Sequence, residues 1–434
     1  MKKLMLFIIV LVSISAFSQE KLSLEECQIL VRKNYPLGKK SDLLTKQNNL
    51  DVAVINTAKL PKLEASAQAT YQSDVIELPI SIPNISIESP NNDQYKATIS
   101  VNQLIYDGGL VNASADAKKA ILKTQRKQVE VSLYQLKKEV NQLFFSIVLL
   151  QEKRDLLIAK ETLLISKLKE VKAGVEYGVL LPTSDKTIEA ELLKIEQQFI
   201  EIDQNKISLL TTLSKLIGKN IPLTVSLESP IIVADFDGEV QRPELELFQL
   251  QKQQVEASEK VISKKNRPKL LGFATGGYGN PGLNMLDNSF QPFYIVGAKL
   301  NWNIFDGNAT KKQRKSLQIN KELIDNQQEV FQLNTTIELQ QQQSEITKIT
   351  AFITSDNTII NLREEILKSA EAQLKNGVIT SSAYITELTN LHEAKNTLST
   401  HKIELQLAKA NYRTTKGVPS LTLPKGKGTT PQKH

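Results

Sequence analysis

Hydrophobic and polar residues alternate along two short stretches in the first half of the chain, residues 61–71 and 95–105. A period of two residues is typical of a strand that has one apolar and one polar face. Beyond residue 109 the spacing of apolar residues changes to alternating fours and threes, as in the run 129–150. That spacing is typical of coiled-coil helices. The pattern predicts, in order, a helix over 23–58, strands over 61–71 and 95–105, and long helices over 110–173 and 183–217.

The second half of the chain repeats this order of elements. It predicts a helix over 244–265, strands over 268–278 and 293–305, and helices over 309–376 and 378–416. Pro61 corresponds to Pro268 at an offset of 207 positions, and Gly178 corresponds to Gly377 at an offset of 199. The difference in length falls in 72–94 or in its counterpart 279–290, which predicts exposed loops there. The chain therefore divides into a first repeat (19–217), a linker (218–243) and a second repeat (244–417).

A short phrase marks the same point in both repeats, where the strand pattern gives way to the helix pattern. It reads NQLIYDGG from Asn102 and NWNIFDGN from Asn301. An aspartate can accept hydrogen bonds from free backbone N–H groups, and a glycine can take a conformation that other residues avoid. The phrase predicts two strand-to-helix joints, made by Asp107 and Gly108 and by Asp306 and Gly307.

The ends of the chain differ in character from the repeats. Residues 1–18 resemble an export signal, because two lysines precede an apolar run that ends in Ala-Phe-Ser. The tail 418–434 is rich in Lys, Gly, Thr and Pro, which predicts disorder. No stretch after the signal reaches the roughly 20 apolar residues of a membrane-spanning helix, so any crossing must use strands. A half-buried hairpin of a soluble protein has the same alternation and stays an alternative.

Composition gives no support to enzymatic or nucleic-acid-binding functions. The formal net charge of +7 is spread through helical segments and forms no basic stripe, so no nucleic-acid partner is expected. His392, His401 and His434 lack the spacing of metal ligands, and the glycines of 272–279 are not followed by a helix as in a phosphate loop. We expect no enzyme activity, no cofactor and no metal site.

The number of strands constrains any membrane assembly. Four strands cannot close a barrel, and an open edge in lipid leaves unpaired backbone groups. Two copies would give eight strands, which fill with side chains, whereas three copies would give twelve and leave a lumen. A trimer is the favoured solution.

These features together resemble the TolC-type outer-membrane efflux protein family. The resemblance rests on the export signal, the Ser23-Leu-Glu-Glu helix start, the two Pro-Lys-Leu strand starts, the two joints and the glycine turns, and it covers about 22–418. It implies an α+β, mostly α fold of two tandem repeats, assembled as a homotrimer. Three copies would form a 12-stranded transmembrane β-barrel in the outer membrane of a Gram-negative bacterium, continued by a periplasmic α-helical barrel. The implied role is the exit duct of a tripartite efflux or type I secretion system, with a periplasmic adaptor and an inner-membrane transporter of RND or ABC type as partners.

The resemblance also suggests where partners bind and where the duct closes. The two helix-turn-helix tips would contact the adaptor through Gly174, Gly178, Leu181, Pro182, Thr183, Ser184 and Asp185, and through Asn376, Gly377, Thr380, Ser381 and Ser382. Gly178 and Gly377 can equally be plain helix C-caps. Family channels often place an aspartate just after the second tip; this chain has none there, so Tyr384 or Glu387 is the candidate gate.

Two questions stay open from the sequence. A coiled-coil spacer or adhesin without a pore would also explain the helices, although it leaves the strands and their aromatic ends unexplained. The cargo is not specified, and the absence of methionine or histidine clusters favours organic molecules over metal ions.

Overall fold

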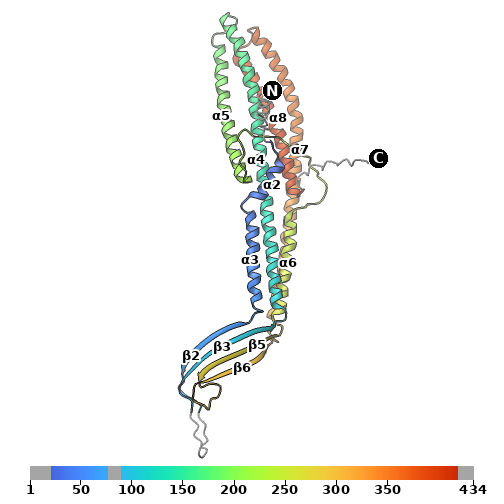
Figure 1. Cartoon of the computed structure of the whole chain (residues 1–434). Helices are drawn as coiled ribbons and strands as arrows, with labels where there is room; N and C mark the ends of the chain where they lie inside the picture. Colours follow the sequence, from blue (N-terminus) through green and yellow to red (C-terminus); the bar gives the residue numbers. More distant parts are fainter. Residues whose placement is uncertain (1–20, 77–88, 419–434) are drawn as a thin grey trace, which may run out of the picture. The chain divides into compact units, whose positions relative to one another are not determined.

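The computed structural model describes residues 21–76 and 89–418 (Figure 1). The described residues form two compact units. The sheet unit comprises 40–76, 89–128 and 246–328, and the helical unit comprises 21–39, 129–245 and 329–418. Each unit takes segments from both sequence repeats, so a repeat is not a compact unit.

The sheet unit contains one antiparallel sheet of four strands. These are β2 (Lys62–Tyr71), β3 (Asp93–Tyr106), β5 (Lys269–Asn280) and β6 (Gln291–Asn301), in the order β2-β3-β5-β6. The strands curve together, with the hairpins of the two repeats joined through β3 and β5 (Figure 1). β6 ends at Asn301, short of the predicted 305, because Asn301 pairs with Lys269, the first residue of its neighbour β5. Among the described residues, no strand pairs with the outer edge of β2 or of β6.

The chain enters the sheet unit through two helices where the sequence predicted one. α2 (Leu24–Asn34) starts at a Ser23 cap, whose hydroxyl accepts a hydrogen bond from Glu26 N at 3.2 Å. It stops before Pro36, and α3 (Gly38–Thr57) follows. A proline disfavours helical conformation in the residue before it, and Tyr35 is accordingly extended.

The long helices are α4 (Leu110–Glu176), α5 (Ser184–Ile217), α7 (Ala309–Lys375) and α8 (Ser381–Lys416). α6 (Pro243–Lys265) precedes β5, and the two-residue strands β1 (Lys21–Leu22) and β4 (Ser226–Leu227) pair in parallel. α8 starts three residues after the predicted 378, because the intervening residues close the turn and Thr380 caps the helix through its hydroxyl.

Two hydrophobic cores hold the helical unit together. The first joins α2, α4, α5 and α8 to the linker, which contributes Ile221, Val225, Leu227 and Ile232. The second lies nearer the helix turns and uses heptad-spaced residues of all four long helices, namely Leu157, Leu164, Val171, Ile188, Ile195, Ala370, Leu374, Tyr384 and Leu388. The coiled-coil prediction is confirmed.

Three sequence-based expectations fall outside the described residues: the export signal at 1–18, all but the first residue of the tail at 418–434, and residues 77–88 of the first loop. None of the helices within 21–76 and 89–418 combines the length and the apolar character that crossing a membrane would require.

Candidate functional site

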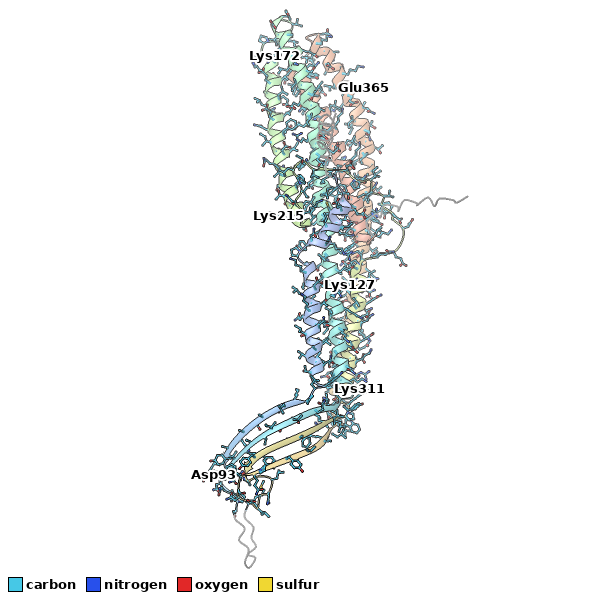
Figure 2. The ribbon with its side chains drawn as sticks, viewed as in Figure 1. Asp93, Lys127, Lys172, Lys215, Lys311 and Glu365 are labelled. Carbon is cyan, nitrogen blue, oxygen red and sulfur yellow. The ribbon has the colours of Figure 1, made fainter. Side chains whose placement is uncertain are left out.

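The sheet has one apolar and one polar face. Because directly paired residues of neighbouring strands point to the same face, the strand register assigns every side chain to a face. The apolar face carries Leu63, Ala65, Ala67, Ala69 and Tyr71 of β2, Tyr95, Ala97, Ile99 and Val101 of β3, Ala274, Gly276 and Tyr278 of β5, and Tyr294, Val296, Ala298 and Leu300 of β6. Its only charged residue within the four strands is Asp93, at the loop end of the sheet (Figure 2).

The apolar face is the more exposed one along β3, while β2 is exposed on both faces. Leu63 is 71% exposed, Val296 is 72% exposed and Leu300 is 64% exposed, whereas along β3 the polar residues are the half-buried ones. A soluble protein buries the apolar face of its sheet, and a large exposed apolar surface marks contact with a membrane or with another protein. The alternation predicted from the sequence is therefore present with the orientation expected of a lipid-facing strand.

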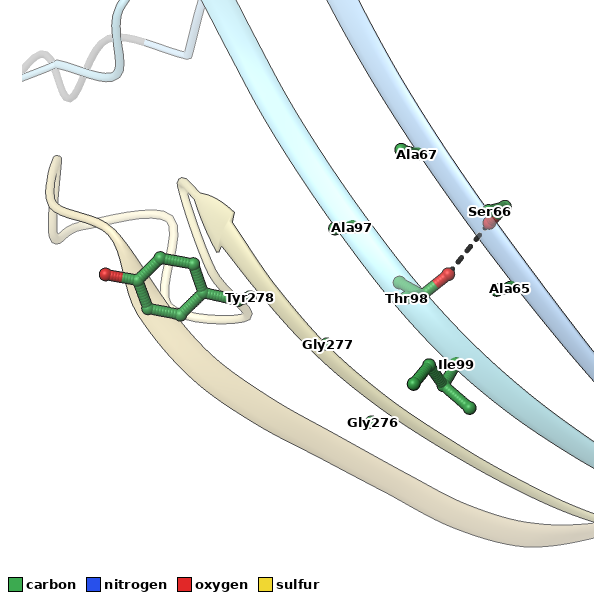
Figure 3. A pocket seen from close by; sticks show the side chains of 9 residues that line it. All are labelled: Ala65, Ser66, Ala67, Ala97, Thr98, Ile99, Gly276, Gly277 and Tyr278. Atoms are coloured by element: carbon green, nitrogen blue, oxygen red, sulfur yellow. Dashed lines mark hydrogen bonds between the residues drawn. The ribbon is translucent and has the colours of Figure 1, made fainter.

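Small residues hollow the middle of the apolar face (Figure 3). Ala65, Ala67, Ala97 and Gly276 line a shallow depression beside the larger Tyr278. Tyr71, Tyr95, Tyr278 and Tyr294 lie towards the loop end of this face, whereas Phe293 points to the opposite face.

The polar face is held by hydroxyl pairs and by aromatic rings that cover glycines. Ser66 and Thr98 hydroxyls lie 2.9 Å apart (Figure 3), and those of Ser100 and Thr275 lie 3.0 Å apart. The ring of Phe293 lies over Gly277, where an added Cβ would come within 2.4 Å of the ring. The ring of Phe273 covers Gly297 in the same way. Larger residues at these two glycines would push the rings away.

The two strand-to-helix joints have the same geometry. Asp107 accepts hydrogen bonds from Gly109 N at 2.8 Å and from Val111 N at 2.5 Å. Asp306 accepts from Thr310 N at 2.9 Å, and also from the side chains of Thr310 and Asn266. These bonds lower the pKa of Asp306 to about 2. Each joint thus satisfies free N–H groups at the start of a helix of 67 residues.

Glycines take the left-handed conformation at both joints. Gly108 has φ of 68° and Gly307 has φ of 62°. Gly108 is also closely covered, because an added Cβ would lie 2.3 Å from Cβ of Arg267. The residue that follows each of these glycines is left-handed too, and in the second repeat it is Asn308, a residue type that tolerates this conformation.

The first tip closes over Gly174. Backbone N–H groups of Val179 and Leu180 both donate to Gly174 O, at 2.8 and 3.0 Å. The Leu180 side chain lies on Gly174, where an added Cβ would meet it at 2.8 Å. Thr183 is the N-cap of α5, directly before its first residue, and its side chain makes no capping bond. Its φ of 76° is unusual for a β-branched residue.

The second tip repeats the turn and touches the first. Val378 N donates to Gln373 O at 2.9 Å, as Val179 N does to Gly174 O, 199 positions earlier. Gly377 has φ of 70°, and an added Cβ would lie 3.3 Å from Val179 O. Positive φ at Gly178 and Gly377 explains the glycine at both positions.

The predicted adaptor-contact residues differ in exposure. Those that are exposed are Gly178, Leu181, Pro182, Thr183, Asn376, Gly377, Thr380 and Ser382. Gly174 and Asp185 are half-buried, and Ser184 and Ser381 are buried, so these two serines offer no surface to a partner in this arrangement. Three further exposed apolar side chains lie within the predicted tip segments, 174–185 and 376–384, although the prediction did not name them individually: Tyr177, Val179 and Val378. In the sequence, each of the three is an apolar residue next to the turn glycine, Gly178 or Gly377.

The two candidate gate residues have different environments. Tyr384 is 1% exposed and lies in the second core, with the Lys167 ammonium 5.6 Å from the centre of its ring. Its burial inside one chain argues against a gating role. Glu387 is half-buried and accepts from Arg363 Nη1 of α7 at 3.3 Å, which links α8 to α7.

Buried lysines connect the repeats near the tips. The Lys167 side chain is 7% exposed and its ammonium lies 2.6 Å from Glu371 and 2.7 Å from Glu170. Burial alone would lower the pKa of Lys167, but the two hydrogen bonds raise it. Lys160 likewise pairs with Glu191 at 2.8 Å and donates to Thr389 of α8. These contacts tie α4 of the first repeat to α7 and α8 of the second.

Within the described part of the chain, no group of three or more histidine, cysteine or acidic residues could hold a metal ion. His401 Nδ1 lies 2.6 Å from Asp356 Oδ2, and burial lowers the pKa of His392 to about 4. His434 lies outside the described residues.

Residues 42–219 match the family model described as outer membrane efflux protein, and this range contains most of the first repeat, of which the second is an internal copy. Over this range the chain is similar to the outer membrane efflux protein family. That family consists of outer-membrane efflux ducts rather than enzymes, and the match supports an outer-membrane location with part of the chain in the periplasm. The comparison with curated proteins gives no match.

Solved structures of an outer membrane protein and of outer membrane channels share the fold. The outer membrane protein VceC from Vibrio cholerae aligns with a TM-score of 0.65 at 14% identity, covering 91% of this chain and 96% of that one. The CmeC outer membrane channel of Campylobacter jejuni gives 0.62 at 15% identity, with 91% and 85% covered. The open-state MtrE outer membrane channel of Neisseria gonorrhoeae gives 0.63 at 13% identity, with 91% and 88% covered. The recognition of a TolC-like protein from sequence is confirmed.

Proposed function

We propose that three copies of this chain form a passive exit duct whose outer-membrane part is a shared 12-stranded β-barrel. The observation that carries the proposal is the sheet itself, whose apolar face is exposed while its two edge strands, β2 and β6, have no partner among the described residues. In lipid each unpaired backbone group costs several kcal/mol, so the edges must pair with other copies. Pairing β2 of one copy with β6 of the next closes the barrel at twelve strands.

The helices support the same assembly. α5 exposes Leu193, Ile200 and Ile207, which are spaced by seven residues, and α7 exposes Phe352, Ile359 and Ile366 at the same spacing. A heptad stripe of apolar residues is a coiled-coil seam that requires a partner helix. We infer that the seams of α5 and α7 pack between neighbouring copies and continue the duct as a periplasmic helical barrel.

The tips are the proposed docking site of a periplasmic adaptor. Leu181, Tyr177, Val179 and Val378 expose apolar side chains there, next to the polar Thr183 and Asn376. Exposed apolar groups of this kind mark protein contacts. The adaptor would connect the duct to an inner-membrane transporter of RND or ABC type, in a tripartite efflux or type I secretion system, and the transporter would supply the energy.

The proposed gate is the Glu387–Arg363 pair. It joins α7 to α8 soon after the second tip, so breaking it would free the start of α8 to move relative to α7. Tyr384 is not proposed, because it is buried. The rival reading, a non-porous spacer or adhesin, leaves the exposed apolar face of the sheet without a role.

Disulfide trapping between the two edge strands tests the shared barrel. In a Cys27→Ala background, one cysteine replaces Val296 of β6, and a second replaces Ala65, Ala67 or Ala69 of β2 in turn. We expect oxidation in outer membranes to yield covalently linked trimers for at least one pairing, because a disulfide needs Cα atoms within about 7 Å. The control pairs the cysteine at 296 with one at Ala97 of the interior strand β3, which should give none. Absence of linkage at every β2 position would contradict the shared barrel.

A further inference from the structure

The charged residues of the polar face of the sheet are strongly biased in sign. The strand register places Lys62, Glu64, Lys96, Lys269 and Lys299 on this face. Four lysines against one glutamate leave a formal charge of +3 in each chain. None of the four lysines forms an ion pair among the described residues.

The lysines occur at both ends of the face. Lys96 lies towards the loop end, where its ammonium is 4.8 Å from the centre of the Phe293 ring. Lys62, Lys269 and Lys299 lie towards the joints. Lys299 pairs with Leu271, and Lys269 is two residues further along β5 on the same face, so the two lysines are diagonal neighbours. Like charges at such positions repel one another unless an anion lies between them.

The rest of the face provides no compensating negative charge. Its other polar residues are neutral, and the Ser66–Thr98 and Ser100–Thr275 hydroxyls already hydrogen-bond in pairs. The remaining large side chains are apolar, namely Leu104, Leu271, Phe273, Phe293 and Ile295. The lysine ammonium groups therefore set the sign of the potential over this face.

We propose that the polar face makes the duct anion-selective, so that anions and negatively charged organic solutes pass more readily than cations. The inference rests on the proposed function, in which this face lines the lumen. Three copies would then place nine net positive charges around one aqueous path. A lumen lined by one sign of charge raises the local concentration of counter-ions, and rings of lysine favour anions in pores.

The test is the reversal potential of the purified full-length protein in planar lipid bilayers across a potassium chloride gradient. We expect a chloride-to-potassium permeability ratio above one, which falls by about twofold or more in Lys96→Gln/Lys299→Gln. The matched control Lys96→Arg/Lys299→Arg keeps the charge and should keep the ratio. Glu64→Gln should raise it. The preference should weaken at high salt, because screening shortens the range of the charges.

The possible outcomes separate this inference from the proposed function. A conducting channel that prefers cations, or whose ratio is the same in the glutamine and arginine variants, overturns the anion selectivity and leaves the duct intact. A trimer that never conducts overturns the duct, and the anion selectivity with it. Trimer migration on gels, checked for each variant, excludes misfolding as the cause of a changed ratio.

Discussion

Asp107 and Asp306, 199 positions apart, each accept a hydrogen bond from the backbone N–H four residues further on, that of Val111 and of Thr310. Each carboxylate thus caps the long helix that follows the last strand of its repeat, α4 or α7, and a left-handed glycine follows each aspartate. The joint sets where the long helix begins in both repeats. Its repetition explains why the same short phrase occurs twice.

Removal of the first cap should weaken the protein measurably. Asp107→Ala leaves two N–H groups at the start of α4 without their acceptor, and we expect a loss of about 1 kcal/mol in the free energy of unfolding. Urea unfolding in detergent, followed by circular dichroism, measures the change. Asp107→Asn keeps one acceptor oxygen and should lose less. Equal losses in both variants would show that the cap is not the cause.

The second joint should make stability depend on pH in the acidic range. The pKa of Asp306 is lowered to about 2, from an ordinary value near 4, so the folded state favours the ionised carboxylate. The contribution of the Asp306 carboxylate to stability is complete at a pH above its ordinary pKa, and it is lost as the pH falls towards 2. Unfolding midpoints measured between pH 5 and pH 2 should fall less steeply in Asp306→Asn than in the native protein. Parallel curves would contradict this assignment.

Thr183 offers a stabilising substitution at the first tip. Its φ of 76° is unfavourable for a β-branched residue and its side chain makes no capping bond, so Thr183→Gly should raise stability by about 1 kcal/mol. Thr187→Gly, inside α5, should lower stability by about the same amount. Thermal unfolding of the two variants gives the comparison. A drop in both would indicate that Thr183 is held by contacts that outweigh the strain.

Lys167 and Glu371 should be energetically coupled across the two repeats. Their 2.6 Å contact is made by a lysine side chain that is almost fully buried. A double-mutant cycle with Lys167→Ala and Glu371→Ala should give a coupling energy of about 1 kcal/mol, measured by unfolding. A value near zero would mean that the pair does not hold α4 to α7.

The gate proposal predicts a change in conductance. Glu387→Gln and Arg363→Gln should each raise the single-channel conductance of the purified protein, because both remove the charge pair between α7 and α8. Glu393→Gln, a substitution further along α8, serves as the control. Unchanged conductance in both gate variants would leave Glu387 as an ordinary surface residue.

Local sequence signals were sufficient for the joints, the long helices and the family. The phrase around Asp107 and Asp306 combines an acceptor with a flexible residue, and it functions in the structure through contacts within four residues of itself. The break at Pro36 also had a local cause, but the helix pattern continued across it and concealed it. The weak, glycine-rich pattern of β5 could not assign faces, which required pairing with β3 and β6.

Burial at the tips could not be read from the sequence. Ser184, Ser381 and Tyr384 are buried because the two helical hairpins pack on each other, and residues almost 200 positions apart determine which face of a helix is covered. Val179 and Val378 lie within the predicted tip segments, but the sequence did not show that their side chains are exposed. The exposed apolar surface at the tips is formed by both turns together, which lie far apart in the sequence.

The most direct test of the shared duct is the native mass of the full-length protein extracted in detergent from outer membranes. Light scattering, corrected for the mass of bound detergent, should give the mass of three chains. That mass is the one expected if strands from all three chains complete one barrel. A monomer or a dimer, or recovery in the soluble fraction, would contradict the account.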